Sequence, residues 1–157
     1  MDEVTLSRPA VKFKKFAYHT GTEWISKRTG ILRSEGKAAF RVASPPEFHG
    51  EAGVWTPEDL FVGSIEVCLM MTFAAYAERK ELPVLSYTSS AEGILEAVDG
   101  KYQFTKVILR PHILLSKADD IELTKRTLQD AYANCLISNS VRSEILVEPK
   151  IEAPSVY

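Results

Sequence analysis

Hydrophobic and polar positions change their spacing along this chain, and each change marks an expected element. From about Val11 to Ala43, aromatic and β-branched residues are punctuated by turn residues at Gly21, Thr29-Gly30 and Glu35-Gly36. This pattern predicts three short antiparallel strands. Residues 44–53 contain two consecutive prolines and two glycines, which remove backbone donors and loosen the chain, so they predict a loop.

A strong helix signal follows this loop. Thr56 suits the N-cap, Pro57 suits the first helical position, and Asp59 stands three residues after the cap, as in a capping box. Pro83 stops the pattern, so we expect a helix from Pro57 to about Lys80.

The middle of this expected helix is unusually apolar. Between Leu60 and Tyr76 nearly every residue is apolar or small, and Glu66 is the charged residue among them. Such a helix has no polar face to present to solvent, so in a chain of 157 residues it needs cover from a partner as well as from its own sheet. The pattern therefore predicts an obligate homodimer.

The second half of the chain predicts a hairpin and a second helix. Strand patterns at about 87–98 and 102–115 flank Asp99-Gly100, which is a strong signal for a type I′ turn. An amphipathic helix follows from about Asp119. Its apolar stripe ends at Cys135, whose side chain we expect to point inward.

A last short strand at about 145–151 gives a single α+β domain over residues 1–157. With a net charge of −2 and charges scattered along the chain, the composition argues against a nucleic-acid partner. The first residues lack the basic start and apolar run of a signal peptide, and no stretch of about 18 residues is apolar without charges. We therefore expect a cytoplasmic protein without membrane contact.

The two cysteines, Cys68 and Cys135, are the candidate reactive groups. A disulfide staple is not expected in the reducing cytoplasm, and the chain has no CxxC spacing. Burial of Cys68 in the apolar helix opposes thiolate formation, so the residues alone leave open two inert core thiols or one catalytic pair. The three histidines show no metal-ligand spacing, and we assign neither a metal nor an organic cofactor.

Two segments of the chain resemble a known family. Residues 56–69, Thr-Pro-Glu-Asp-Leu-Phe-Val-Gly-Ser-Ile-Glu-Val-Cys-Leu, are similar to the Pro-Glu-x-Leu…Cys signature of the OsmC and Ohr family, the osmotically inducible and organic hydroperoxide resistance proteins. Ala-Asn-Cys-Leu-Ile-Ser, at 133–138, stands where that family carries Cys-Pro-(Val/Ile)-Ser. The order of the expected elements matches too, so the resemblance covers nearly the whole chain.

This resemblance implies an OsmC-like fold, in which antiparallel sheets surround a buried central helix that bears the first cysteine. It also implies an intertwined homodimer with its sites at the subunit interface. The implied activity is that of a stress-response thiol peroxidase: Cys68 attacks an organic hydroperoxide, Cys135 resolves the sulfenic acid as a disulfide, and an external dithiol reduces that disulfide. Glu58 and an arginine, for which Arg28 is the first candidate, are implied to hold the Cys68 thiolate.

The arginine has a physical purpose. An unperturbed thiol has a pKa of about 8.5, and making the thiolate dominant by about three pKa units requires roughly 4 kcal/mol. A guanidinium oriented by Glu58 can supply this stabilisation. Hydroperoxide-resistance members carry their arginine in a Gly-Gly-Arg turn near Arg28; the Gly-Gly is absent here, and Arg33 and Arg41 are the alternatives.

The spacing of Glu58 and Cys68 adds a constraint. Ten residues of straight helix separate them by about 15 Å along the axis, which is too far for a shared site. Either Gly63-Ser64 breaks the helix, or the two residues meet across the dimer interface. Two other functions remain open: a non-catalytic dimer that binds a small hydrophobic ligand, and another thiol redox enzyme or sensor that uses Cys68.

Overall fold

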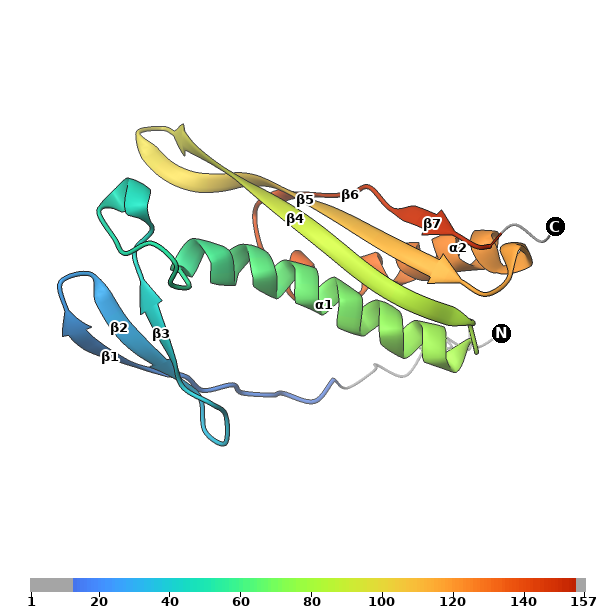
Figure 1. The fold of residues 1–157 in the computed structure, drawn as a ribbon, viewed down its shortest axis with the longest axis horizontal. Coiled ribbons are helices and arrows are strands. Elements are labelled where there is room, and N and C mark those ends of the chain that lie inside the picture. The colour runs from blue at the N-terminus through green and yellow to red at the C-terminus, as the bar shows by residue number, and fades with distance from the viewer. Residues whose placement is uncertain (1–12, 155–157) are drawn as a thin grey trace, which may run out of the picture. The chain divides into compact units, whose positions relative to one another are not determined.

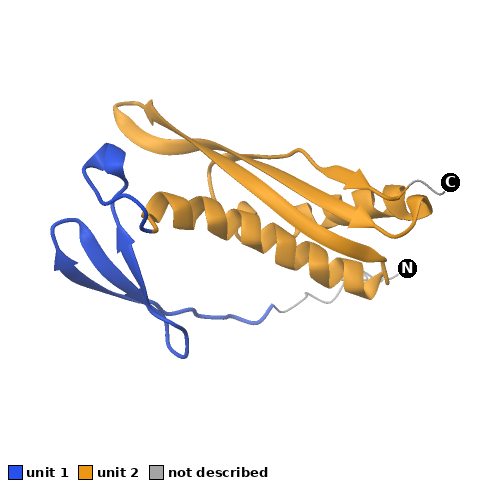
Figure 2. Cartoon of the chain, viewed as in Figure 1, with its two compact units in different colours: residues 1–54 blue, residues 55–157 orange. Residues whose placement is uncertain are grey.

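The computed structural model describes residues 13–154 of the chain. The chain divides into two compact units, residues 1–54 and 55–157, and each is described by itself (Figure 2). The expectation of one domain over residues 1–157 stays a prediction. Residues 11 and 12 of the expected strand region, and the N-terminal residues used to argue against a signal peptide, lie outside the described residues.

The first unit contains a three-stranded antiparallel sheet. Its strands β1 (Gly21–Ser26), β2 (Thr29–Arg33) and β3 (Phe40–Ala43) lie in the order β1-β2-β3, which confirms the three expected strands (Figure 1). The expected turn at Thr29-Gly30 is wrong: Thr29 already pairs with Ser26 in the ladder, so the chain turns before it. The short 3-10 helix η1 (Pro46–Phe48) lies within the expected loop.

The second unit begins with the long helix α1 (Pro57–Arg79), which confirms the expected helix. The capping box forms as the sequence suggests. The Asp59 amide donates to the Thr56 hydroxyl oxygen at 3.1 Å, and the Thr56 amide donates to Asp59 Oδ2 at 3.0 Å. The helix runs without a break through Gly63 and Ser64.

A four-stranded sheet lies against this helix. The hairpin of β4 (Val84–Val98) and β5 (Lys101–Leu115) is confirmed, with positive φ angles of 49° at Asp99 and 75° at Gly100, as a type I′ turn requires. The expected closing strand is present as β6 (Glu144–Val147) and β7 (Lys150–Glu152).

Both closing strands pair with β5 in parallel, so this sheet is mixed, with the antiparallel β4–β5 hairpin as its larger part. The physical reason is the connection between β5 and β6. The short 3-10 helix η2 (Ala118–Asp120), helix α2 (Ile121–Ala133) and the 3-10 turn η3 (Ser138–Ser140) carry the chain back along the sheet before β6 begins. A crossover of this kind returns the chain in the direction of the strand it left.

The hydrophobic core lies between the sheet and the two helices α1 and α2 (Figure 1). α1 contributes apolar residues spaced four apart, β5 contributes alternate residues, and α2 contributes its apolar stripe. The buried members are Ile65, Leu69, Phe73, Ala77, Val107, Leu109, Ile113, Leu115, Leu128, Ala131, Cys135 and Ile145.

In the described part of the chain, α1 buries a single stripe, formed by Ile65, Leu69, Phe73 and Ala77. On another face of the helix, Val67 and Met71 are 52% and 54% exposed. α1 is also the one helix among the described residues that is long and apolar enough to cross a membrane, by length and composition alone, although Glu66 interrupts its apolar stretch with a charge. The core helix of a water-soluble protein passes the same test, and α1 packs on the sheet and on α2.

Thr56→Ala is expected to lower the free energy of unfolding by about 1 kcal/mol, because the first turn of α1 loses the oxygen that accepts from the Asp59 amide. Urea unfolding at one fixed protein concentration measures the change. Thr56→Ser keeps the cap oxygen and serves as the matched control. Equal stability of the two variants would show that this cap does not hold the start of the helix.

Candidate functional site

Cys68 lies in the middle of α1, at the edge of its buried stripe. Its neighbour Leu69 is 1% exposed and belongs to the core, whereas Cys68 itself is half-buried. The thiol therefore faces neither the centre of the core nor open solvent. This position lets groups from a neighbouring element approach the sulfur.

Cys135 is held by the turn that follows α2. The helix ends at Ala133, and the Cys135 amide donates to the Tyr132 carbonyl at 3.1 Å. The Ser138 hydroxyl donates to Cys135 Sγ at 3.1 Å. The side chain is fully buried, as its place at the end of the apolar stripe predicted.

The two thiols lie close enough together for each to shift the pKa of the other. The backbone of Ile137 and Leu136, in the same turn as Cys135, contributes to lowering the pKa of Cys68 as well. The packing of α1 against α2 and the following turn thus joins two cysteines that are far apart in the sequence. Both are free thiols.

The surroundings of Cys68 favour its thiolate. Burial opposes ionisation, but hydrogen bonds from the Ile137 backbone, from Cys135, from Thr72 and from the Leu136 backbone outweigh it, and the pKa of Cys68 is lowered. The Thr72 hydroxyl has one proton, which it donates to the Cys68 carbonyl at 2.8 Å. If this hydroxyl rotates to donate to the Cys68 sulfur, it gives up its hydrogen bond to the Cys68 carbonyl.

Cys135 has the opposite tendency. Burial raises the pKa of Cys135, and the hydrogen bond and charge of Cys68 raise it further, while Ser138 opposes the change. The pair therefore combines one thiol whose pKa is lowered with one whose pKa is raised. Among residues 13–154, no group of three His, Cys, Asp or Glu side chains is placed to hold a metal ion.

Tyr87, a residue that the sequence patterns do not single out, lies in the electrostatic surroundings of the pair. Its ring packs on Phe73 with centroids 5.6 Å apart, and its hydroxyl is buried without a hydrogen-bond partner in the described part of the chain. Burial and the charges of Glu66 and Cys135 raise the pKa of Tyr87 to about 12. A tyrosine in a strand pattern carries no signal that distinguishes it from a core residue.

Comparison with known proteins identifies the family. The model of the OsmC-like protein family matches residues 50–150, which include both cysteines. The chain belongs to the OsmC-like protein family. The resemblance seen in the two cysteine segments is thereby confirmed.

Individual relatives agree with this assignment. The uncharacterised protein YmaD of Bacillus subtilis is 26% identical over 140 residues, covering 87% of this chain and 92% of YmaD. An OsmC-like protein of unknown function from Vibrio cholerae is 25% identical with a TM-score of 0.80, over 86% of this chain and 99% of that one. An organic hydroperoxide resistance protein OsmC from Legionella pneumophila is 24% identical with a TM-score of 0.68, over 88% and 99%.

Glu58 is the next residue that the resemblance implies for an OsmC-like site. It lies in the first turn of α1, and its Oε2 atom is buried without a hydrogen-bond partner in the described residues. Because α1 is continuous, a break at Gly63-Ser64 is excluded, and about 15 Å along the helix axis separates Glu58 from Cys68 in the same chain. One chain therefore does not bring the two residues together.

The predicted cation, Arg28, belongs to the first unit of this OsmC-like protein. Its guanidinium donates to the Phe48 carbonyl of the same unit. Arg33 and Arg41 each form an ion pair with a glutamate of that unit. The pKa of Cys68 is lowered by the hydrogen bonds described above. The assignment of Arg28 as the cation beside the Cys68 thiolate stays a prediction.

Cys135→Ala is expected to raise the pKa of Cys68, because the remaining thiol loses one of the hydrogen bonds that stabilise its thiolate. Cys135→Ser keeps a donor at this place and is the matched control. The rate of alkylation by iodoacetamide rises with pH as Cys68 ionises, so the midpoint of the rate gives its pKa. The midpoint should lie at higher pH in Cys135→Ala than in Cys135→Ser, and equal midpoints would contradict this role of Cys135.

Proposed function

We propose that this OsmC-like protein is a thiol-dependent peroxidase that reduces organic hydroperoxides. The observation that carries the proposal is the thiol pair itself, in which Cys68 and Cys135 lie close together and their pKa values are shifted in opposite directions. A peroxidatic thiol must be ionised to attack, whereas a resolving thiol must wait until the sulfenic acid exists. The pKa values of Cys68 and Cys135 are shifted in the directions that these two roles require.

The proposed cycle has three steps. The Cys68 thiolate attacks one peroxide oxygen, the O–O bond breaks, and the alkoxide leaves as an alcohol after taking a proton, so Cys68 becomes a sulfenic acid. The Cys135 thiol then displaces the hydroxyl, and a disulfide and water form. An external dithiol reduces the disulfide to two thiols and is itself oxidised to a disulfide. The cycle uses neither a metal nor an organic cofactor, and its need for a dithiol suits a cytoplasmic location.

The names of several similar proteins support this choice of substrate. The Legionella pneumophila protein and a protein from Elizabethkingia anophelis are both called organic hydroperoxide resistance proteins. Their structural likeness to this chain concerns the fold, and the substrate is carried over as part of the proposal. The apolar surroundings of Cys68 in α1 suit the alkyl part of such a substrate better than they suit hydrogen peroxide.

We propose that the site is completed in a homodimer. Val67 and Met71 form an apolar face of α1 that residues 13–154 leave exposed, and Glu58 has a buried carboxylate oxygen that receives no hydrogen bond from these residues. Burying an apolar face and supplying a donor to a buried carboxylate are both favourable. A second copy, with its own α1 beside the first, can bring Glu58 of one chain to Cys68 of the other. Arg28 is the guanidinium that we propose for this shared site.

A peroxide-consumption assay with excess dithiol tests the activity. Cys68→Ser should reduce turnover of cumene hydroperoxide to the background, because the attacking thiolate is lost. Cys135→Ser should complete one turnover and accumulate sulfenic acid, which a sulfenic-acid probe detects. Arg28→Gln should lower the rate, whereas Arg126→Gln, at an exposed position of α2, is the control that should not.

The outcomes of this assay separate the alternatives. Unchanged turnover in Cys68→Ser would rule out the peroxidase. Equal rates with cumene hydroperoxide and hydrogen peroxide would favour a thiol redox enzyme or sensor without preference for organic substrates. No turnover with either peroxide, together with binding of the intact hydroperoxide, would favour the non-catalytic ligand-binding dimer.

Mixed dimers test the shared site. Neither Glu58→Gln nor Cys68→Ser should be active alone, but mixing the two chains should restore up to about half the native activity per mixed dimer, because one of its two equivalent sites keeps both residues. Sites formed within single chains would give no restoration. The control is a mixture of Cys68→Ser with a chain that carries Glu58→Gln and Cys68→Ser together, which has no complete site in either arrangement.

A further inference from the structure

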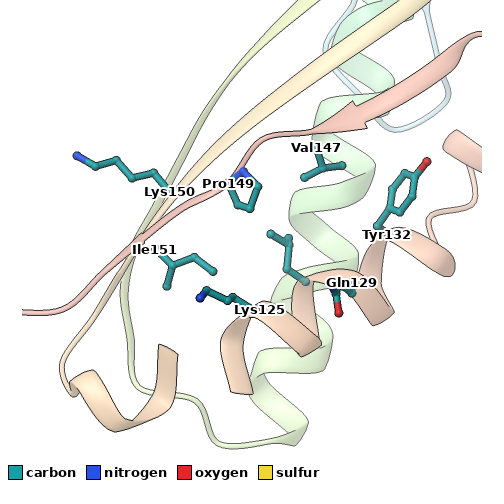
Figure 3. A pocket seen from close by; sticks show the side chains of 8 residues that line it. Lys125, Gln129, Tyr132, Val147, Pro149, Lys150 and Ile151 are labelled. Carbon is teal, nitrogen blue, oxygen red and sulfur yellow. The ribbon is translucent and has the colours of Figure 1, made fainter. Parts of the chain in front are cut away.

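A groove lies between α2 and the segment that contains the end of β6 and the start of β7, apart from the thiol pair (Figure 3). Its volume is about 600 Å³, and neither cysteine lines it. This volume falls within the range of about 300–1,000 Å³ that is typical of small-molecule sites. The proposed peroxidase cycle makes no use of it.

The walls of the groove are mainly apolar. Leu128 of α2 lines the groove together with Val147 and Ile151 of the strand segment. The ring of Tyr132 closes the groove at one end, and its hydroxyl donates to the Ile145 carbonyl at 3.1 Å, which fixes the ring. The shape is thus built by side chains whose positions are already held by the core and by hydrogen bonds.

The other end of the groove carries positive charge. Lys125, two helical turns before Tyr132, extends its amine toward Ile151, whereas the amine of Lys150 points away from the groove (Figure 3). Gln129, one helical turn after Lys125, adds an amide to the lining, and no acidic residue lines the groove. Lys125 pairs with Glu122 at 2.6 Å, but exposed pairs of this kind contribute little, so the amine can turn to another anion.

The strand side of the groove does not suit an added peptide strand. β6 ends at Val147 and β7 begins at Lys150, so the ladder is interrupted between them. Pro149 lies in this interruption and has no N–H to donate. An occupant that binds through its own hydrocarbon chain, without needing backbone hydrogen bonds, fits these walls better.

We propose that the groove binds a free medium-chain carboxylate. Its hydrocarbon chain lies along Leu128, Val147 and Ile151, and its carboxylate lies at the Lys125 end, where the amine and the Gln129 amide donate to it. An ammonium and an amide placed at the mouth of an apolar groove are the complement of a single anionic head on an apolar tail. The site is separate from the thiols, so it does not depend on the peroxidase activity.

Calorimetric titration of the full-length protein with decanoate, below its micelle concentration, tests the proposal. One site per chain is expected, with weaker binding of decanol and none of decyltrimethylammonium. Lys125→Met should weaken decanoate binding by about tenfold, the effect of losing one charge-assisted hydrogen bond, and should leave decanol binding unchanged. Lys101→Met, at the start of β5, is the matched control and should bind decanoate like the native chain.

Filling the groove tests its position. Ile151→Trp should abolish decanoate binding while circular dichroism shows an intact fold. Gln129→Trp, at an exposed position of α2, fills the groove from the other wall if the first variant does not fold. No decanoate binding to the native chain, unchanged binding in the folded tryptophan variants, or equal binding of decanol and decanoate would each overturn the proposal. So would Lys125-dependent binding to anionic phospholipid vesicles without binding of free decanoate.

Discussion

The packing of α1 against the sheet and α2 is the interaction on which the rest of the structure depends. Ile65, Leu69 and Phe73 form one buried stripe, and this stripe sets the rotation of the helix about its axis. That rotation places Cys68 at the edge of the core, beside the turn that follows α2. A rotation of one residue would send Cys68 into the core or into solvent, because neighbouring residues on a helix are about 100° apart.

The chemistry of the thiols follows from this packing. Burial by itself makes a thiol inert, and it raises the pKa of Cys135. Cys68 escapes this effect because the turn after α2 directs the backbone of Leu136 and Ile137, and the Cys135 thiol, toward its sulfur. Hydrogen bonds from this turn therefore supply part of the thiolate stabilisation that was expected from an arginine.

The same helix also ties the proposed site to assembly. Its stripe toward the sheet is buried, while Val67 and Met71 on another face remain exposed in the part of the chain that the structure describes. Glu58, at the start of the helix, has a buried carboxylate oxygen without a partner in the described residues. In the proposed dimer one second subunit covers the apolar face and completes the carboxylate site, so that stability and activity depend on the same contact.

The elements with local signals could be predicted from the amino-acid sequence. The capping box of Thr56 starts α1, Asp99-Gly100 turns the hairpin, and the two cysteine segments carry the resemblance to the OsmC-like family. These signals are readable because each acts over a few residues. The parallel pairing of the closing strands, the proximity of Cys68 and Cys135, and the burial of the Tyr87 hydroxyl follow from the tertiary structure alone. Each of these depends on atoms that are far apart in the chain and meet only when the helices pack on the sheet.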